Sequence, residues 1–441
     1  MMREVHHFVP RNSEWFKYQI TAFTQSIEIG IVLNSNKDLY KNNLYNYSTY
    51  HFLAGINTSP SSFYAYNDLS QLSYKSPDWF FGFITYDVKN RFEKLYSSNF
   101  DGIDMPELCF FKPEYVIIED NSGWRVEFNK SNNSVEDVIE LIVKIENTNL
   151  NSRDALLTAK NLDVKSRITK DDYIETINKI KRHIHVGDIY EMNYCIEFYS
   201  NPCEINPTGL YYLLNSASPT PFNAYIKFQD KYLICASPER YIKKEGLKLI
   251  SQPIKGTSPR NKVKSVDENA KKQLIVNPKE RAENIMITDL VRNDLSRIAT
   301  KGSVKVEELC GVYSFKQVHQ MISTITATIT DEVSFTDIIR STFPMGSMTG
   351  APKIEAMKLI EQYESTKRGL YSGTVGYISP NGDFDFNVVI RSILYNKTNR
   401  YLSFMVGSAI TDQSDPELEY KECLLKASAI LKVLNSNKDE H

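Results

Sequence analysis

Apolar residues recur along this chain with two different periods, and the period distinguishes predicted helices from predicted strands. The clearest helix begins at Thr169, because Asp172 stands three residues later as in a capping box, and it ends at Gly187. Its apolar stripe has helical spacing and consists of Tyr173, Ile177, Ile180 and Ile184. Three further helices are predicted over residues 279–294, Ala351–Glu361 and Pro416–Leu434, the last with Asp415 as its N-cap.

Short runs of β-branched and aromatic residues predict strands in both halves of the chain. The first 150 residues contain such runs at Trp79–Tyr86 and Tyr115–Ile118, and a polar stretch at Asn147–Asp163 is interpreted as a linker. Later runs are Tyr194–Tyr199, Ala224–Phe228, Tyr232–Ala236, Leu247–Gln252 and Met321–Thr330. Because strands and helices do not alternate strictly, the pattern favours an α+β fold with largely antiparallel sheets. We expect an N-terminal region over 1–150 and a catalytic domain over 165–435.

The composition is that of an ordinary globular protein. Lys and Arg number 52 against 54 Asp and Glu, so the formal net charge is −2, and neither nucleic acid nor an anionic membrane is an expected partner. No apolar run approaches the roughly 18 residues of a membrane span, and Met1–Phe16 lacks the apolar core of a signal peptide. The 6 Cys form no CxxC pair, which is typical of a reducing compartment. We therefore expect a soluble, cytoplasmic protein.

Two sets of charged residues project from single faces of predicted helices. Glu280 and Glu283 are three residues apart, and Glu419, Glu422 and Lys426 follow spacings of three and four. Two such carboxylate pairs facing a common cleft would suit Mg²⁺, a hard cation that takes oxygen ligands. On pattern alone, a solvated helix face is the commoner origin of such a pair, because spacing does not show that the helices meet.

A second candidate group combines Lys255, in the string PIKGT at 253–257, with Glu239, in the string SPER at 237–240. A lysine held between a strand end and a glycine turn can act as a nucleophile if desolvation or a nearby cation removes its proton. A carboxylic acid can protonate a departing hydroxyl group. Pattern alone favours the alternative, which is an exposed turn lysine beside a salt-bridged corner formed by Glu239 and Arg240.

Three further features carry weaker signals. The string GSMTGAPK at 346–353 leads into a helix as an anion-binding loop would, but a helix-capping turn gives the same pattern. Arg391 lies in a β-branched run, where it is either a carboxylate clamp or an edge-strand residue in solvent. His319, taken alone, is more often a hydrogen-bonded structural histidine than an acid–base group.

These strings occur together and in order. From about Thr169 to Leu434 the chain resembles the chorismate-binding domain of anthranilate synthase, aminodeoxychorismate synthase, isochorismate synthase and salicylate synthase. The matching strings are GDIY at 187–190, SPER at 237–240, PIKGT at 253–257, RAENIM at 281–286, DLVRNDL at 289–295, GSMTGAPK at 346–353 and RGLY at 368–371. The resemblance implies sheets packed face to face with outer helices, chorismate as substrate and Mg²⁺ as cofactor. The first 150 residues resemble the family only loosely.

Within this family, two positions sort the chain among the branches. Lys255 stands where aminodeoxychorismate-forming members typically carry lysine and anthranilate-forming members carry alanine. Water-adding members have a lysine at the position of Glu191, and ammonia-using relatives usually have glutamine. Glu191 departs from both patterns, yet it argues against water addition because it is not cationic. The implied product is 4-amino-4-deoxychorismate, on the route to 4-aminobenzoate and folate. The alternatives are an anthranilate-forming component and a catalytically silent chorismate-binding subunit.

The resemblance also assigns roles to single residues. The implied magnesium ligands are Glu283 and Glu422, and the residues that would hold metal-bound waters are Glu280 and Glu419. The groups that would bind the substrate carboxylates are Tyr371, Arg391, Lys426 and the loop at Gly407, Ser408 and Ala409. Ala409 replaces a glycine of the family pattern, so a stiffer loop is expected. The residues that would line the ring and the enolpyruvyl side are Thr257, Thr349 and His319.

The implied mechanism uses Glu239 to protonate the leaving C4 hydroxyl while Lys255, as the free amine, attacks C2. Ammonia then adds at C4 and expels Lys255. The expected catalytic residues are Lys255 and Glu239, together with His319 from the lining of the substrate ring. Members of the family draw ammonia from a separate glutamine amidotransferase subunit. This chain has no Gly-x-Cys-x-Gly nucleophile string, so the resemblance implies such a partner.

Overall fold

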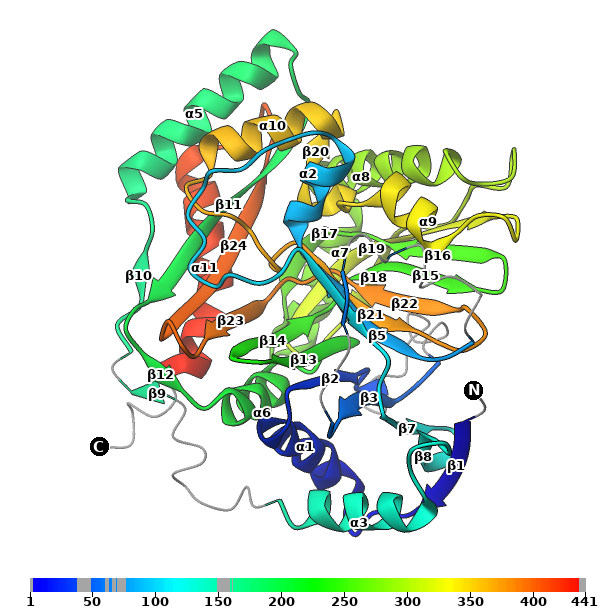
Figure 1. Cartoon of the computed structure of the whole chain (residues 1–441). Helices are drawn as coiled ribbons and strands as arrows, with labels where there is room; N and C mark the ends of the chain where they lie inside the picture. The colour runs from blue at the N-terminus through cyan, green and yellow to red at the C-terminus, as the bar shows by residue number, and fades with distance from the viewer. Residues whose placement is uncertain are drawn as a thin grey trace.

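Two large β-sheets make up the centre of the fold (Figure 1). The computed structural model describes residues 3–37, 49–59, 63–65, 69, 77–148, 159–160 and 162–435. Over these ranges the larger sheet has 12 strands, in the order β1-β8-β7-β3-β2-β13-β14-β23-β24-β11-β10 with β20 beside β11. The smaller sheet has 10, in the order β17-β19-β16-β15-β22-β21-β5-β6-β4 with β18 beside β19. Neighbouring strands are antiparallel, as at β11 and β24 or β17 and β19.

The strands have the following bounds. The larger sheet contains β1 (Arg3–Phe8), β2 (Ile29–Asn34), β3 (Phe52–Asn57), β7 (Tyr115–Asp120), β8 (Gly123–Asn129), β10 (Lys165–Ser166), β11 (Glu191–Ser200), β13 (Phe222–Phe228), β14 (Lys231–Ser237), β20 (Gly350–Ala351), β23 (Ser392–Asn396) and β24 (Tyr401–Ile410). The smaller sheet contains β4 (Phe63–Tyr64), β5 (Phe80–Ile84), β6 (Leu108–Phe111), β15 (Arg240–Glu245), β16 (Lys248–Gln252), β17 (Ile254–Pro259), β18 (Lys305–Ser314), β19 (Val318–Thr328), β21 (Thr374–Ile378) and β22 (Phe384–Asn387). A separate pair is formed by β9 (Ala159–Lys160) and β12 (Glu204–Ile205).

Helices lie outside the sheets. They are α1 (Ser13–Phe23), α2 (Lys89–Phe92), α3 (Val135–Glu146), α5 (Lys170–Val186), α6 (Pro207–Ala217), α7 (Lys264–Val276), α8 (Pro278–Ser296), α9 (Phe335–Thr342), α10 (Lys353–Tyr363) and α11 (Pro416–Asn435). Short 3-10 turns are η1 (Thr24–Ser26), η5 (Tyr86–Val88) and η6 (Gly346–Met348). Figure 1 shows α5, α10 and α11 gathered beside β11 and β24. No helix within the described ranges is both long and apolar enough to cross a membrane.

Apolar side chains form one core layer on each face of the larger sheet. On β2, Ile31 belongs to the layer shared with the smaller sheet, whereas its neighbour Val32 belongs to the layer under the outer helices. Val116 and Ile117 of β7 divide in the same way. Since successive strand side chains point to opposite faces, a strand buried on both sides reads as a continuous apolar run. These layers hold the sheets and helices in the positions from which the site is built.

Capping residues set the boundaries of two helices as expected from the sequence, and a third helix begins later than expected. The hydroxyl of Thr169 accepts a hydrogen bond from the Asp172 N–H, and Gly187 ends α5 at a φ of 88°, which confirms both expected boundaries. Asp415 accepts a hydrogen bond from the N–H three residues later, as an N-cap does. The helix expected from Ala351 instead begins at Lys353, because Ala351 pairs with Glu191 in a short strand.

Each sheet contains strands from both sides of the expected linker. β2 pairs with β13 in the larger sheet, and β5 pairs with β21 in the smaller one. The linker expected at 147–163 lies largely outside the described residues. Residues from the first 150 positions therefore support the same two sheets that carry the candidate site.

Candidate active site

The residues expected to carry chemistry converge where the two sheets and two helices meet. An ion pair between Glu191, at the start of β11, and Lys255 of β17 joins the larger sheet to the smaller one. α8 packs on β17 and β19, and α11 packs on β24. Because Lys279 of α8 forms an ion pair with Glu419 of α11, the two acidic helices face the same region.

Lys255 is held from two sides. Its Nζ lies 3.1 Å from Oε1 of Glu191, and the two side chains are 11% and 1% exposed. The side-chain amide of Asn284 donates to the Lys255 carbonyl oxygen at 3.2 Å, which fixes β17 against α8. Gly256 follows at a φ of 98°, and a Cβ there would lie 3.1 Å from Oε2 of Glu280, so glycine permits this close approach. Lys255 is thus not the exposed turn lysine of the alternative interpretation.

Carboxylates determine the charge of Lys255. Burial alone lowers the pKa of a lysine, but the negative charges of Glu191, Glu283 and Glu239 raise the pKa of Lys255 above its ordinary value. Lys255 is therefore an ammonium group in the unliganded protein. It must transfer a proton before it can act as a nucleophile.

Glu239 is a buried carboxyl group between β14 and β15. Its Oε1 accepts a hydrogen bond from the Ser347 hydroxyl at 2.6 Å. Burial raises the pKa of Glu239 to about 7, although Ser347 and the positive charge of Lys255 act in the opposite direction. A carboxyl group with this pKa carries a proton much of the time near neutral pH, as a general acid requires. Its neighbour Arg240 forms its ion pair with Asp385, Nε to Oδ1 at 2.9 Å.

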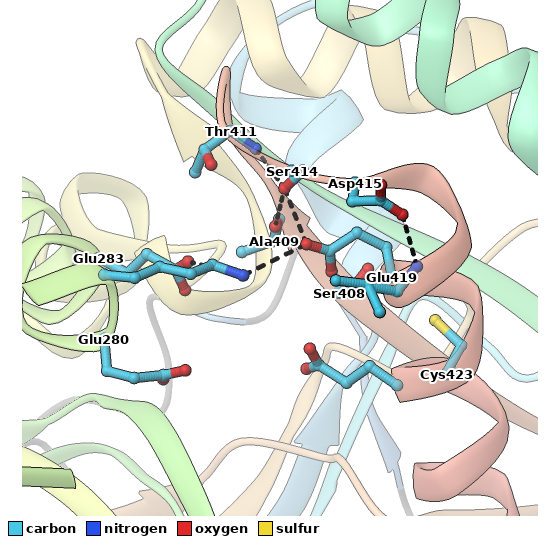
Figure 2. Close-up of polar contacts among 12 residues, drawn as sticks. Glu280, Glu283, Ser408, Ala409, Thr411, Ser414, Asp415, Glu419 and Cys423 are labelled. Atoms are coloured by element: carbon cyan, nitrogen blue, oxygen red, sulfur yellow. Dashed lines mark hydrogen bonds and ion pairs between the residues drawn. The ribbon is translucent and has the colours of Figure 1, made fainter. Parts of the chain in front are cut away.

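Carboxylates from α8 and α11 face one another. Figure 2 shows Glu280 and Glu283 on one side and Glu419 on the other. The Nζ of Lys279 lies between them, 3.4 Å from Oε1 of Glu419 and 3.9 Å from Oε1 of Glu283. Glu422 belongs to the same group, because its negative charge adds to burial in raising the pKa of Glu280. The two helix faces are therefore turned toward a common region.

Glu283 is a buried member of this acidic group with little compensation of its charge. Burial raises the pKa of Glu283 to about 7, and its Oε1 is buried without a hydrogen-bond partner among the described residues. Oxygen donors of this kind suit a hard divalent cation. Across the described ranges, no three His, Cys, Asp or Glu side chains lie close enough together to hold a metal ion as they stand. Mg²⁺ usually keeps several waters and needs only one or two protein carboxylates, so a pair of glutamates on facing helices is sufficient for it.

Two basic residues expected to bind carboxylates differ in what holds them. Arg391 is partly buried at a φ of 50°, and its guanidinium has no hydrogen bond or ion pair to any described residue. Burial lowers the pKa of Arg391 to about 10. A planar guanidinium with open donors is well suited to a carboxylate ligand. Lys426 is exposed, lies 2.8 Å from Glu422 and donates to the carbonyl oxygen of Gly407 at 2.8 Å.

Comparison with known proteins identifies the family to which this arrangement belongs. A family model described as chorismate binding enzyme matches residues 31–432. The chain belongs to this family. Aminodeoxychorismate synthase component 1 of Bacillus subtilis is 32% identical over 369 residues, covering 81% of this chain and 77% of that protein. Anthranilate synthase component 1 of Aquifex aeolicus is 30% identical over 367 residues, covering 80% and 73%.

A solved structure shows the same fold as this chorismate binding enzyme. Anthranilate synthase component I from Streptococcus pneumoniae superimposes with a TM-score of 0.72 at 24% identity, covering 85% of this chain and 92% of that one. The likeness confirms the expected α+β fold of antiparallel sheets with outer helices. In this chain the two sheets include strands from both sides of the expected linker.

Other residues that the family resemblance singled out have varied surroundings. Tyr371 is buried, with its hydroxyl 4.0 Å from the sulfur of Cys195. A Cβ at Gly407 would lie 2.5 Å from the same sulfur, so only glycine fits there. Thr349 is buried and donates to carbonyl oxygens of its own turn, whereas Thr257 is exposed. The loop expected at Gly407, Ser408 and Ala409 is wrong, because these residues belong to β24, where they pair with β11, Ala409 with Asn193. The roles of these residues stay predictions.

The imidazole of His319 contacts residues other than the expected catalytic ones. Its Nδ1 lies 2.8 Å from the Ser314 hydroxyl and its Nε2 lies 3.2 Å from Oδ1 of Asp267. Its neighbour Gln320 projects to the opposite face of β19 and pairs with Thr257 in the strand register. The amide oxygen of Gln320 is buried without a hydrogen-bond partner among the described residues. Gln320 is thus a polar candidate that the sequence interpretation missed, although strand alternation could have indicated it.

A buried arginine fixes the loops beside the site. Arg368 forms an ion pair with Glu364 at 2.6 Å, and both side chains are almost fully buried. The same guanidinium donates to the carbonyl oxygens of Met348 and Asn193 at 2.6 and 2.8 Å. It therefore ties the 346–353 turn to β11, next to Glu191.

Arg368→Ala is expected to lower the free energy of unfolding by about 3–5 kcal/mol, because Glu364 would remain as an uncompensated buried charge. Chemical denaturation of the full chain measures this value. The matched control is Arg292→Ala, which breaks an exposed pair with Asp289 and should cost less than about 1 kcal/mol. Equal, small losses in both variants would contradict the structural role of Arg368.

Proposed function

We propose that this chain converts chorismate and ammonia to 4-amino-4-deoxychorismate, as component 1 of an aminodeoxychorismate synthase. Relatives named as aminodeoxychorismate synthase and as anthranilate synthase are similarly close, at 32% and 30% identity, so identity alone does not choose between them. The observation that carries the proposal is Lys255, a lysine held within the site by Glu191 at 3.1 Å. It supplies the nucleophile that the aminodeoxychorismate route requires.

Residues of this site would carry out substrate binding, protonation of the leaving group and nucleophilic attack in the proposed reaction. The open guanidinium of Arg391 would bind a substrate carboxylate and orient the ring. Glu239, with its pKa near 7, would donate a proton to the leaving C4 hydroxyl. Lys255, once deprotonated, would attack C2, and ammonia would then attack C4 and release the lysine. Burial of Glu239 and Lys255 keeps competing water away from the intermediate.

The acidic helices fit magnesium by the chemistry of their donors. The carboxylates of Glu283 and Glu422 would hold the ion, and Glu280 and Glu419 would hold its waters. Among the described residues, Oε1 of Glu283 accepts no hydrogen bond, and the pKa values of Glu280 and Glu283 are raised, so a bound cation would stabilise the charged form of these carboxylates. When bound, the ion would neutralise part of the negative charge of chorismate.

Glu239→Gln is expected to lower kcat/KM for chorismate by about 100-fold or more, because general acid catalysis contributes roughly 10²–10⁴. The carboxyl must be protonated to act, so the wild-type value should fall as pH rises through about 7. The pH profile should be measured at a constant concentration of free ammonia. The variant should lose this falling limb. A variant that keeps both the rate and the limb would remove Glu239 from the mechanism.

We also propose that a separate glutamine amidotransferase supplies ammonia, since no Gly-x-Cys-x-Gly string occurs in the chain. Mass spectrometry of the products tests both proposals. The purified chain with chorismate, Mg²⁺ and ammonium should form 4-amino-4-deoxychorismate, and glutamine should not replace ammonium. Anthranilate as the product would overturn the proposed function. Product formed from glutamine by the chain alone would overturn the partner.

A further inference from the structure

The ion pair between Lys255 and Glu191 is largely buried. Glu191 is 1% exposed, and one of its oxygens, Oε2, has no hydrogen-bond partner among the described residues. The other oxygen contacts Lys255 at 3.1 Å. Burying a carboxylate oxygen without a hydrogen-bond partner costs folding free energy, so such a group in a folded protein calls for a functional explanation. The group that it contacts is the proposed nucleophile.

Several charged groups face Lys255 from the surrounding elements. They are Glu191 of β11, Glu239 after β14, Glu280 and Glu283 of α8, and Glu422 of α11. The acids of α8 and α11 lie beside the expected cation site, and Glu239 must carry a proton to act as the acid. Within the part of the chain that the structure describes, only Glu191 contacts the Lys255 ammonium directly as a hydrogen-bonded carboxylate.

We propose that Glu191 is the base that takes the proton from Lys255 and thereby generates the nucleophilic amine. The inference rests on the proposed function, because it needs Lys255 to attack chorismate. A proton moves from Nζ of Lys255 to a carboxylate oxygen of Glu191, converting a buried ion pair into a buried neutral pair. Both groups already lie within hydrogen-bond reach, as proton transfer requires.

The step balances in atoms and electrons. The freed lone pair of Nζ forms the bond to C2, the two ring double bonds shift, and the C4–O bond breaks as Glu239 protonates the hydroxyl to water. Ammonia then forms the C4–N bond, the double bonds shift back, and Lys255 leaves with the electrons of its C–N bond. The new C4 ammonium returns a proton to Glu239, and Glu191 returns its proton to Lys255.

A base and a purely electrostatic partner predict opposite results for Glu191→Gln. Removing a negative charge from the surroundings of Lys255 makes its ammonium form less stable, so a purely electrostatic partner would leave more amine and faster attack. Removing a base instead slows attack, because solvent must accept the proton. The sign of the change therefore separates the two roles.

The experiment follows covalent attachment in the full-length chain. Chorismate and Mg²⁺ are added without ammonia, and quenched samples are analysed by intact mass at several pH values. Glu191→Gln should slow attachment by about 100-fold at neutral pH, and the residual rate should rise with pH. Glu191→Asp, which retains a carboxylate, should recover part of the rate. Glu197→Gln is the control, since Glu197 is a buried acid on the same face of β11 paired with Arg167.

An unchanged or faster rate in Glu191→Gln would overturn the base while leaving the covalent route intact. If the wild-type chain forms no adduct, the covalent route and this inference fail together, whereas product analysis still tests the amination itself. Should Glu191→Gln not fold, Glu191→Asp alone decides: its attachment rate must fall below that of wild type, with chorismate binding retained.

Discussion

Lys255→Ala should lose covalent capture of the substrate entirely and should form 4-amino-4-deoxychorismate about 100-fold more slowly or worse. The reason is that Nζ makes the bond on which the two-stage route depends. A loss of this size corresponds to roughly 2.7 kcal/mol of transition-state stabilisation. Chorismate binding should change little, because Arg391 remains. Steady-state kinetics with ammonium, together with a binding measurement, test these expectations.

The control for this variant is Lys262→Ala, an exposed lysine beyond the same strand. It should retain the wild-type rate. Slow amination by direct attack of ammonia is expected to persist in Lys255→Ala. If that variant instead produces aminodeoxychorismate at the wild-type rate, Lys255 is not catalytic and direct addition becomes the better account.

Exhaustive chelation should abolish turnover, and Mg²⁺ should restore it. The four glutamates of α8 and α11 carry negative charge that opposes binding of an anionic substrate unless a cation intervenes. Glu283→Gln should raise the Mg²⁺ concentration needed for half-maximal rate, because it removes an expected ligand. The activity assay should be run over a Mg²⁺ titration after chelation. Full activity in the chelated enzyme would remove magnesium from the mechanism.

Much of the fold could be predicted because local signals were strong. The capping box at Thr169 and Asp172, and Gly187 at the end of α5, fix that helix by local hydrogen bonds and backbone conformation. The start of α10 could not be predicted in the same way. Ala351 joins β11 through a partner distant in sequence, and no local pattern shows such a pairing.

In the candidate site, too, local spacing could be predicted from the sequence, whereas contacts between distant elements could not. Spacing placed Glu280 with Glu283 and Glu419 with Glu422, but only the folded chain shows α8 facing α11. The sequence likewise did not show that Glu191 contacts Lys255, because β11 and β17 belong to different sheets. The charge of Lys255 depends on that contact. Lys255 is desolvated by burial, but the surrounding acids outweigh this effect and raise its pKa.

The central role of Lys255 is tested most directly by the mass of the wild-type chain after incubation with chorismate and Mg²⁺ in the absence of ammonia. We expect an added mass equal to dehydrated chorismate, which peptide mapping places on Lys255. Adding ammonium should then release the adduct as 4-amino-4-deoxychorismate. An unmodified chain under single-turnover conditions, or an adduct on a different residue, would contradict the central role of Lys255.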